Sequence, residues 1–340
     1  MTLDAIRGVA ALCVVWLHWA VPVGVFKPPA AGLAVDLFFQ LSGFVLCHNY
    51  EQRFQNGLTW SRFAVIRLVR LAPLNLLGCG IVLTALILNR YGAPDWSMPQ
   101  AAYILVSGAA FLPVPQSIGD DPNLYLFPHN FPVWSLFFEL FVNLVYVLIS
   151  ASLTTRRLIA LIAISAVAQV GATAYFNTFE TGATWITFLG GFSRVMFGFF
   201  LGVLLYRTRH IAAPRGVNTP LLLVGLFLIL IGSRSPIYAE IVTFFIFPLL
   251  IIVAARTEPK SGSLQNFYLA LGGLSYSIYI LHIPLRMLFM SILEWFSTTE
   301  VVHFGKLRGG LALIALVLIS MWADTVYDRR AREWLKQWLR

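Results

Sequence analysis

Residues 132–150 read PVWSLFFELFVNLVYVLIS, an apolar stretch that contains one charged residue, Glu139. A helix needs about 20 largely apolar residues to cross a membrane. Stretches of this kind recur along the whole chain, and they predict an all-α, polytopic membrane protein with about ten spans. The expected spans are 4–24, 33–50, 71–89, 132–150, 157–177, 184–206, 218–234, 238–255, 269–293 and 309–327.

The composition supports a membrane protein and excludes several other classes. Hydrophobic residues make up 59% of the 340 residues and charged residues 11%, whereas an ordinary soluble domain has about 25% charged residues. The chain is too apolar for a disordered protein, and its 3 Cys give no disulfide framework. The net charge of +9 does not indicate nucleic-acid binding, because the basic residues lie between the apolar stretches, where membrane topology accounts for them.

The distribution of Lys and Arg predicts the orientation. With the N-terminus inside, 16 of the 24 basic residues fall on cytoplasmic segments and 5 on outer segments. We therefore expect both termini in the cytoplasm, residues 90–131 outside, and residues 1–340 as a single domain in the cell inner membrane. The stretch 101–115 is too short to span and predicts a re-entrant or surface helix within the outer segment. Gly198 and Gly202 predict close contacts between helices.

Three ionisable residues within the spans are expected at one depth. From the helical rise, His18 lies about 21 Å above the cytoplasmic side and His282 about 20 Å above it. Glu139 lies about 10 Å below the outer surface of a core about 30 Å thick. An imidazole beside a carboxylate is a suitable general base, so His18 and Glu139 are the catalytic candidates. The alternative is that each is a buried residue with a structural hydrogen bond, and for His282, just before Pro284, this alternative is favoured.

Arginines at the cytoplasmic side are the candidates for binding a phosphorylated ligand. Arg67 and Arg70 are three residues apart, on one face of a helix, and two guanidinium groups side by side fit phosphate oxygens well. Arg7 either joins them or pairs with Asp4. The alternative is that these residues only follow the positive-inside rule.

Three further candidates carry less specific signals. Arg194 falls near mid-membrane, where it needs a carboxylate partner or water. Asp36 lies just inside the outer end of the second span. Ser42 is a possible nucleophile, but no activating base is adjacent in sequence, so close packing is favoured.

Five segments of the chain resemble conserved segments of the acyltransferase 3 family of integral membrane acyltransferases. In chain order they are LDAIRGVAA (3–11) with His18, DLFFQLSGF (36–44), RLVRLAP (67–73), WSLFFE (134–139) and LSYSIYILHIP (274–284). The segments occur in family order over nearly the whole chain. Asn75 departs from the pattern, because the family often has an aromatic residue after the proline.

The resemblance implies a ten-helix domain that transfers an acyl group, commonly acetyl, from acyl-CoA to a hydroxyl group of a carbohydrate or glycosylated acceptor. It implies that His18 is catalytic, that Glu139 is the family's acidic residue, and that Arg7, Arg67 and Arg70 are associated with the donor. No permanently bound cofactor is implied.

Two other classes of function remain as alternatives. A transporter or flippase without chemistry also suits ten spans with charges near the midplane, but it predicts internal symmetry, which the sequence does not show. A receptor or scaffold leaves the combination of His, Glu and Arg residues unexplained.

Overall fold

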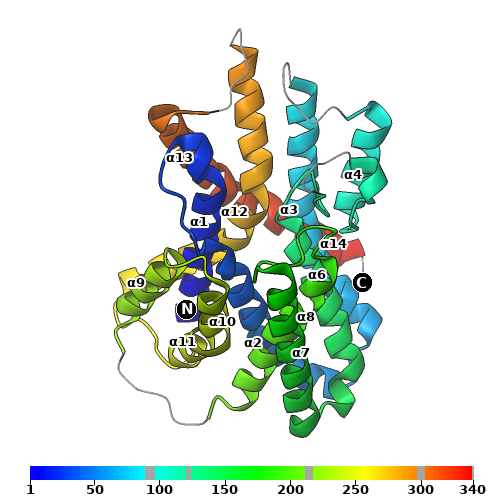
Figure 1. The fold of residues 1–340 in the computed structure, drawn as a ribbon, viewed down its shortest axis with the longest axis vertical. Coiled ribbons are helices and arrows are strands. Elements are labelled where there is room, and N and C mark those ends of the chain that lie inside the picture. The colour runs from blue at the N-terminus through cyan, green and yellow to red at the C-terminus, as the bar shows by residue number, and fades with distance from the viewer. Residues whose placement is uncertain (89–95, 120–123, 211–216, 297–302, 339–340) are drawn as a thin grey trace.

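The computed structural model describes residues 1–88, 96–119, 124–210, 217–296 and 303–338 (Figure 1). Within these ranges the chain is helical, and an isolated antiparallel bridge joins Tyr125 and Thr184. The α-helices are α1 (Thr2–Val23), α2 (Ala34–Gln55), α3 (Trp60–Leu88), α4 (Met98–Ala109), α5 (Gln116–Gly119), α6 (Val133–Ile149), α7 (Thr155–Phe176), α8 (Phe188–Arg207), α9 (Thr219–Leu230), α10 (Pro236–Ile241), α11 (Phe247–Ala254), α12 (Gly262–Trp295), α13 (Lys306–Trp322) and α14 (Arg329–Trp338).

Nine helical stretches in the described ranges are long and apolar enough to cross a membrane. They are Thr2–Val23, Ala31–Gln55, Trp60–Leu88, Val133–Ser152, Thr155–Phe176, Phe188–Arg207, Pro236–Ala254, Gly262–Trp295 and Lys306–Gln337. The all-α, multi-pass architecture is therefore confirmed. Two helices begin well before their expected spans: α3 at Trp60 and α12 at Gly262. In both helices, the residues that precede the expected span are more polar than the apolar stretch from which that span was predicted.

The stretch 218–234, expected as a full span, forms the short helix α9 of 12 residues. Such a helix is about 18 Å long, shorter than a hydrocarbon core about 30 Å thick, so α9 by itself makes up only part of a crossing. Pro220 lies in its first turn, and at its end Tyr238 donates a hydrogen bond to the carbonyl of Ile229. The apolar composition of this segment predicted a helix correctly, but its length was overestimated.

Helices α1, α12 and α3 lie side by side, with α12 in the middle (Figure 1). A second group is formed by α2 and α7, which both pack against α8. The contact between α2 and α8 depends on glycine. A Cβ on Gly202 would overlap the backbone of Gln40, and a Cβ on Gly198 would lie 3.0 Å from the Cβ of Phe39. The expected close contacts at Gly198 and Gly202 are thus confirmed, and they bring α2 against α8.

Helix α12 continues through Pro284 because another element replaces the hydrogen bond that proline removes. Proline has no N–H, so the carbonyl of Ile280 has no partner in the helix ladder. The side chain of Asn130 donates to this carbonyl at 3.0 Å. The polypeptide before α6 therefore fixes α12 at Ile280, two residues before His282.

The short helix expected within 101–115 is present as α4. It begins with a capping box formed by Ser97 and Gln100 and packs beside α3. Asn75 of α3 donates a hydrogen bond to the carbonyl of Gly108 at 2.9 Å. This bond gives a structural role to the residue that departs from the family pattern. Of the 90–131 segment, residues 90–95 and 120–123 lie outside the described ranges.

Candidate active site

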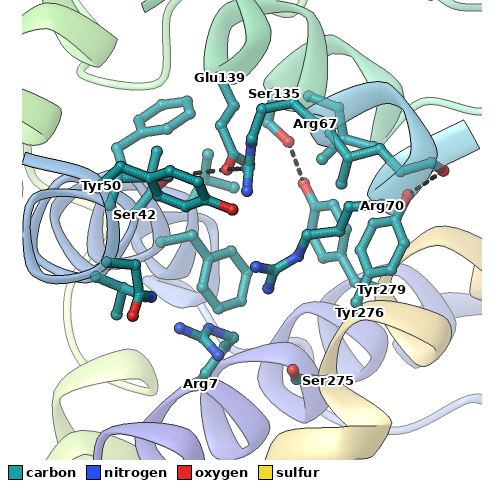
Figure 2. Close-up of a pocket in the computed structure, with 18 residues that line it drawn as sticks. Arg7, Ser42, Tyr50, Arg67, Arg70, Ser135, Glu139, Ser275, Tyr276 and Tyr279 are labelled. Carbon is teal, nitrogen blue, oxygen red and sulfur yellow. Dashed lines mark hydrogen bonds and ion pairs between the residues drawn. The ribbon is translucent and has the colours of Figure 1, made fainter. Parts of the chain in front are cut away.

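One cavity gathers the three arginines that the sequence singled out, and we call it the arginine cavity. It contains about 820 Å³ of space between protein atoms, including its open mouth. Arg7 comes from α1, Arg67 and Arg70 from α3, and Glu139 from α6. Figure 2 shows the guanidinium groups of Arg7 and Arg70 directed into this space.

Arg67 is held in place by Glu139. Its NH2 lies 2.6 Å from Oε1 of Glu139, and both side chains are largely buried, with 5% and 19% exposed. The hydroxyl of Ser42 donates to the same carboxylate oxygen at 2.8 Å (Figure 2). Ser42 thus orients Glu139. Gly43, the residue after Ser42, packs so closely on α8 that a Cβ there would overlap the backbone of Phe199.

The arginine cavity has an excess of positive charge. Glu139 is the one carboxylate among its described lining residues, and Arg67 already pairs with it. Arg7 also lies 3.4 Å from Asp4, so both of its expected arrangements occur together. Arg70 has no carboxylate within ion-pair distance in the described part of the chain. Arg70 is therefore the cation most available to an anionic ligand.

His18 forms a hydrogen-bonded pair with His282. Nδ1 of His18 lies 2.9 Å from Nε2 of His282, and the two rings are stacked. Nδ1 of His282 lies 2.7 Å from the carbonyl oxygen of Tyr279. A carbonyl only accepts, so His282 carries its proton on Nδ1, and with both rings neutral its Nε2 accepts the Nδ1 proton of His18. This arrangement leaves Nε2 of His18 unprotonated.

A second, larger cavity is lined by His18, and we call it the histidine cavity. It contains about 1550 Å³ of space between protein atoms, including its open mouth. His282 is fully buried behind His18 and does not line the cavity. Nδ1 of His18 is occupied by His282, so Nε2 is the ring nitrogen that remains for a ligand. The pair thus has one buried member that orients the ring and one that can act on a ligand.

The two cavities meet at a shared wall. Val35 of α2 and Tyr279 of α12 line both of them. The hydroxyl of Tyr279 lies 2.7 Å from Oγ of Ser135, which fixes the ring at this position. Tyr279 therefore has two roles, because its ring separates the cavities and its carbonyl orients His282.

The expected contact between His18 and Glu139 is not formed. Among the described residues, His18 bonds to His282, and Glu139 bonds to Arg67 and Ser42. His18 and Glu139 also line different cavities. The helical rise predicts how deep each residue lies in the membrane, but it does not predict the direction of the side chain around the helix axis. His282, for which a structural hydrogen bond was favoured, makes that bond and is also the partner of His18.

Arg194 and Asp36 form the most buried ion pair of the described chain. Nε and NH2 of Arg194 donate to the two carboxylate oxygens of Asp36 at 2.8 and 2.7 Å, and each side chain is 2% exposed. NH1 of Arg194 donates to the carbonyl of Thr181 at 3.0 Å. The expected carboxylate partner of Arg194 is therefore Asp36, and the pair joins α2 to α8.

Several residues at the cavities were not singled out from the sequence. Tyr276 and Tyr279, three residues apart on α12, line the arginine cavity. The sequence signal for them is the periodicity of the segment 274–284, because residues three apart lie on one face of a helix. Arg286 lies one helical turn after His282, and its NH1 donates to the carbonyl of His18 at 2.6 Å. His129 lies outside both cavities; it is fully buried, and burial lowers the pKa of its ring to about 4.

The comparisons with known proteins identify the family of the chain. The acyltransferase 3 family model, described as "Acyltransferase domain", matches residues 2–324. The chain is also 39% identical over 184 residues to "Protein 2 in picA locus" of Rhizobium radiobacter, which covers 51% of this chain and 94% of that protein. No solved structure matches the chain. Since the family match extends from the first helix into η4 (Ala323–Asp328), the chain belongs to the acyltransferase 3 family and is a multi-pass membrane acyltransferase.

Proposed function

We propose that the protein transfers an acyl group, in the first instance acetyl, from acyl-CoA to a hydroxyl group of a carbohydrate or glycosylated acceptor. The observation that carries the proposal is His18, which lines the histidine cavity while His282 holds its Nδ1 proton. The donor is a substrate, and no bound cofactor takes part.

The arginine cavity is the proposed site of the CoA phosphates. Arg7, Arg67 and Arg70 converge there with a single carboxylate among the described lining residues. Guanidinium groups bind phosphate oxygens through paired, charge-assisted hydrogen bonds. With CoA held here, its pantetheine arm would pass the wall formed by Val35 and Tyr279 and bring the thioester to His18.

The proposed reaction uses His18 as a general base. Nε2 of His18 takes the proton of the acceptor hydroxyl as its oxygen attacks the carbonyl carbon of the thioester. The C–S bond then breaks, the acyl group stays on the acceptor oxygen, and CoA leaves as the thiol after taking the proton from His18. His282 stabilises the imidazolium that forms in between, because its Nε2 accepts from Nδ1 of His18.

The test of the proposed function is an assay of the purified protein in lipid nanodiscs with acetyl-CoA and candidate hydroxyl acceptors. We expect free CoA thiol and acetylated acceptor to form in equal amounts, and both to depend on His18. Uptake or flipping of a saccharide without thioester cleavage would favour a transporter instead.

The first prediction concerns the donor. Arg70→Ala should weaken acetyl-CoA binding about tenfold or more, because a charge-assisted hydrogen bond contributes about 1.5–3 kcal/mol. Arg70 suits this test because none of the described carboxylates pairs with it, so its removal leaves no orphaned charge. Binding is measured by isothermal titration calorimetry with non-hydrolysable acetyl-CoA. The matched control is Arg62→Ala, because Arg62 is an exposed arginine on the same helix. Equal affinity of both variants for acetyl-CoA would show that Arg70 only follows the positive-inside rule.

The second prediction concerns topology. We propose that both termini and the segment 51–71 are cytoplasmic, that 218–234 crosses the membrane as a tenth span with α9 as its helical part, and that 90–131 is outside, in the cell inner membrane, so that donor and acceptor approach from opposite sides. Reporter fusions at Gly57 and Asp120 should therefore show opposite sidedness; Asp120 lies outside the described residues. The control is a fusion at Lys260, which should report the same side as Gly57. A cytoplasmic signal at both Gly57 and Asp120 would contradict this orientation.

A further inference from the structure

Arg286 differs from the other buried arginines of the bundle. Arg67 pairs with Glu139, Arg194 with Asp36 and Arg207 with Glu51. Arg286, half-buried in α12, has no carboxylate within ion-pair distance among the residues that the structure describes. A cation without a counter-charge inside a membrane domain is costly, and it is retained where it acts on a ligand or lines an aqueous path.

The guanidinium of Arg286 is anchored beside His18 and is only partly used. Its NH1 donates to the carbonyl oxygen of His18 at 2.6 Å. A guanidinium has five N–H donors, so most of them remain free for another acceptor. Arg286 lines the histidine cavity together with His18, so a ligand bound to it would lie next to the ring of His18.

The remaining charges of the histidine cavity have the same sign as Arg286. Its described lining contains four cations, Lys27, Arg194, Arg234 and Arg286, and one carboxylate, Glu180. Asp36 neutralises Arg194, which leaves three cations against Glu180. Lys27, Arg234 and Glu180 are all exposed. A cavity with this excess of positive charge attracts anions and repels cations.

We propose that the histidine cavity binds an acceptor that carries a negative charge, a carboxylate or a phosphate, close to the hydroxyl that is acylated. Arg286 binds this anionic group through its free N–H donors, and Lys27 and Arg234 attract it at the mouth. The inference rests on the proposed function and names its substrate class, an acidic saccharide. Arg286 is then a residue that determines specificity, while His18 performs the proton transfer.

The experiment compares acceptors that differ only in charge. Acetyl transfer from acetyl-CoA is measured with a uronic acid glycoside, its neutral methyl ester and a hexose phosphate. The unmodified protein should use at least one of the two anionic acceptors with a kcat/KM at least about tenfold higher than that of the ester, and this preference should fall as salt is added. Use of the uronic acid alone, or of the phosphate alone, distinguishes a carboxylate acceptor from a phosphate acceptor.

Two sets of variants test the assignment to Arg286 and the cavity mouth. Arg286→Gln, which keeps a donor for the carbonyl of His18, should raise KM for the preferred anionic acceptor about tenfold and leave the ester nearly unchanged. The double variant Lys27→Gln with Arg234→Gln, at exposed positions where misfolding is not expected, should reduce the salt dependence. The control is Arg308→Gln, an exposed arginine that does not line the cavity.

Three outcomes separate this inference from the proposed function. Equal kcat/KM for the acid and the ester in the unmodified protein would overturn the inference alone. An equal loss with both acceptors in Arg286→Gln would also overturn it, since Arg286 would then act on the thioester or on the position of His18. Failure to transfer acetyl to any acceptor, with no cleavage of acetyl-CoA, would instead contradict the proposed acyltransfer.

Discussion

His18→Ala should lower the rate of acyl transfer by about 10²–10⁴-fold, the usual contribution of a general base, while CoA binding stays unchanged. The physical reason is that His18 lines the histidine cavity and that Nε2 is the unprotonated nitrogen of its ring. Binding should survive because the arginine cavity, where we place CoA, does not include His18. The measurement is single-turnover acetyl transfer, with calorimetric CoA affinity measured in parallel.

Substitution of His282 tests whether His18 acts together with His282 or as a base on its own. His282→Ala removes the acceptor of the His18 Nδ1 proton, so the ring of His18 loses both its orientation and the stabilisation of its charged form. If the two rings act as a unit, the double variant should be hardly slower than His18→Ala alone. His129→Ala is the comparison, because His129 is also fully buried but lies outside both cavities. If the fold-losses in rate of the two single variants multiply in the double variant, the two rings act independently and not as a unit.

The second large effect is expected on stability. Arg194→Met should destabilise the protein by about 3–5 kcal/mol, because it leaves the buried carboxylate of Asp36 without a partner. Arg194 also donates to the carbonyl of Thr181, and that bond is lost with it. The stability is read from the melting temperature and the monodisperse fraction in detergent, with the exposed Arg308→Met as control.

The double variant Asp36→Leu with Arg194→Met shows how much of this loss comes from the unpaired charge. With both charges removed, no ion is left buried, so most of the stability should return. If Arg194→Met melts at the temperature of the unmodified protein, Asp36 has gained another partner or water, and the pair does not hold α2 to α8. If the double variant is no better than the single one, the bond to Thr181 accounts for the loss.

The sequence predicted the helical, multi-pass fold because nearly every span has a sufficiently long apolar stretch. For 218–234 it overestimated the length of the helix, because composition alone does not show that α9 has 12 residues, with Pro220 in its first turn and the Tyr238 contact at its end. Helix α3 begins before the expected span, because the apolar pattern does not include the turns that carry Arg67 and Arg70.

The positions of the candidate residues in the bundle were predicted more reliably than their partners. His18, His282 and Glu139 were all expected inside the bundle, and the paired arginines at one helix face. Depth along a helix is a one-dimensional quantity, however, and the partner of each residue depends on rotation about the axis and on packing. Charge requirements were a better guide, since Arg194 needed a carboxylate and Asp36 was the singled-out residue that supplies one.

The bond from Asn130 to the carbonyl of Ile280 changes how the proline of α12 behaves mechanically. A proline inside a membrane helix often forms a flexible hinge, because the carbonyl without a hydrogen bond lets the two halves of the helix move relative to each other. Here the freed carbonyl is bonded by a separate part of the chain, so the two halves of the helix are held in one arrangement. The half of α12 that carries Tyr279 and His282 is thereby held relative to Arg286, and the histidine pair keeps its alignment without any closing motion of the helix.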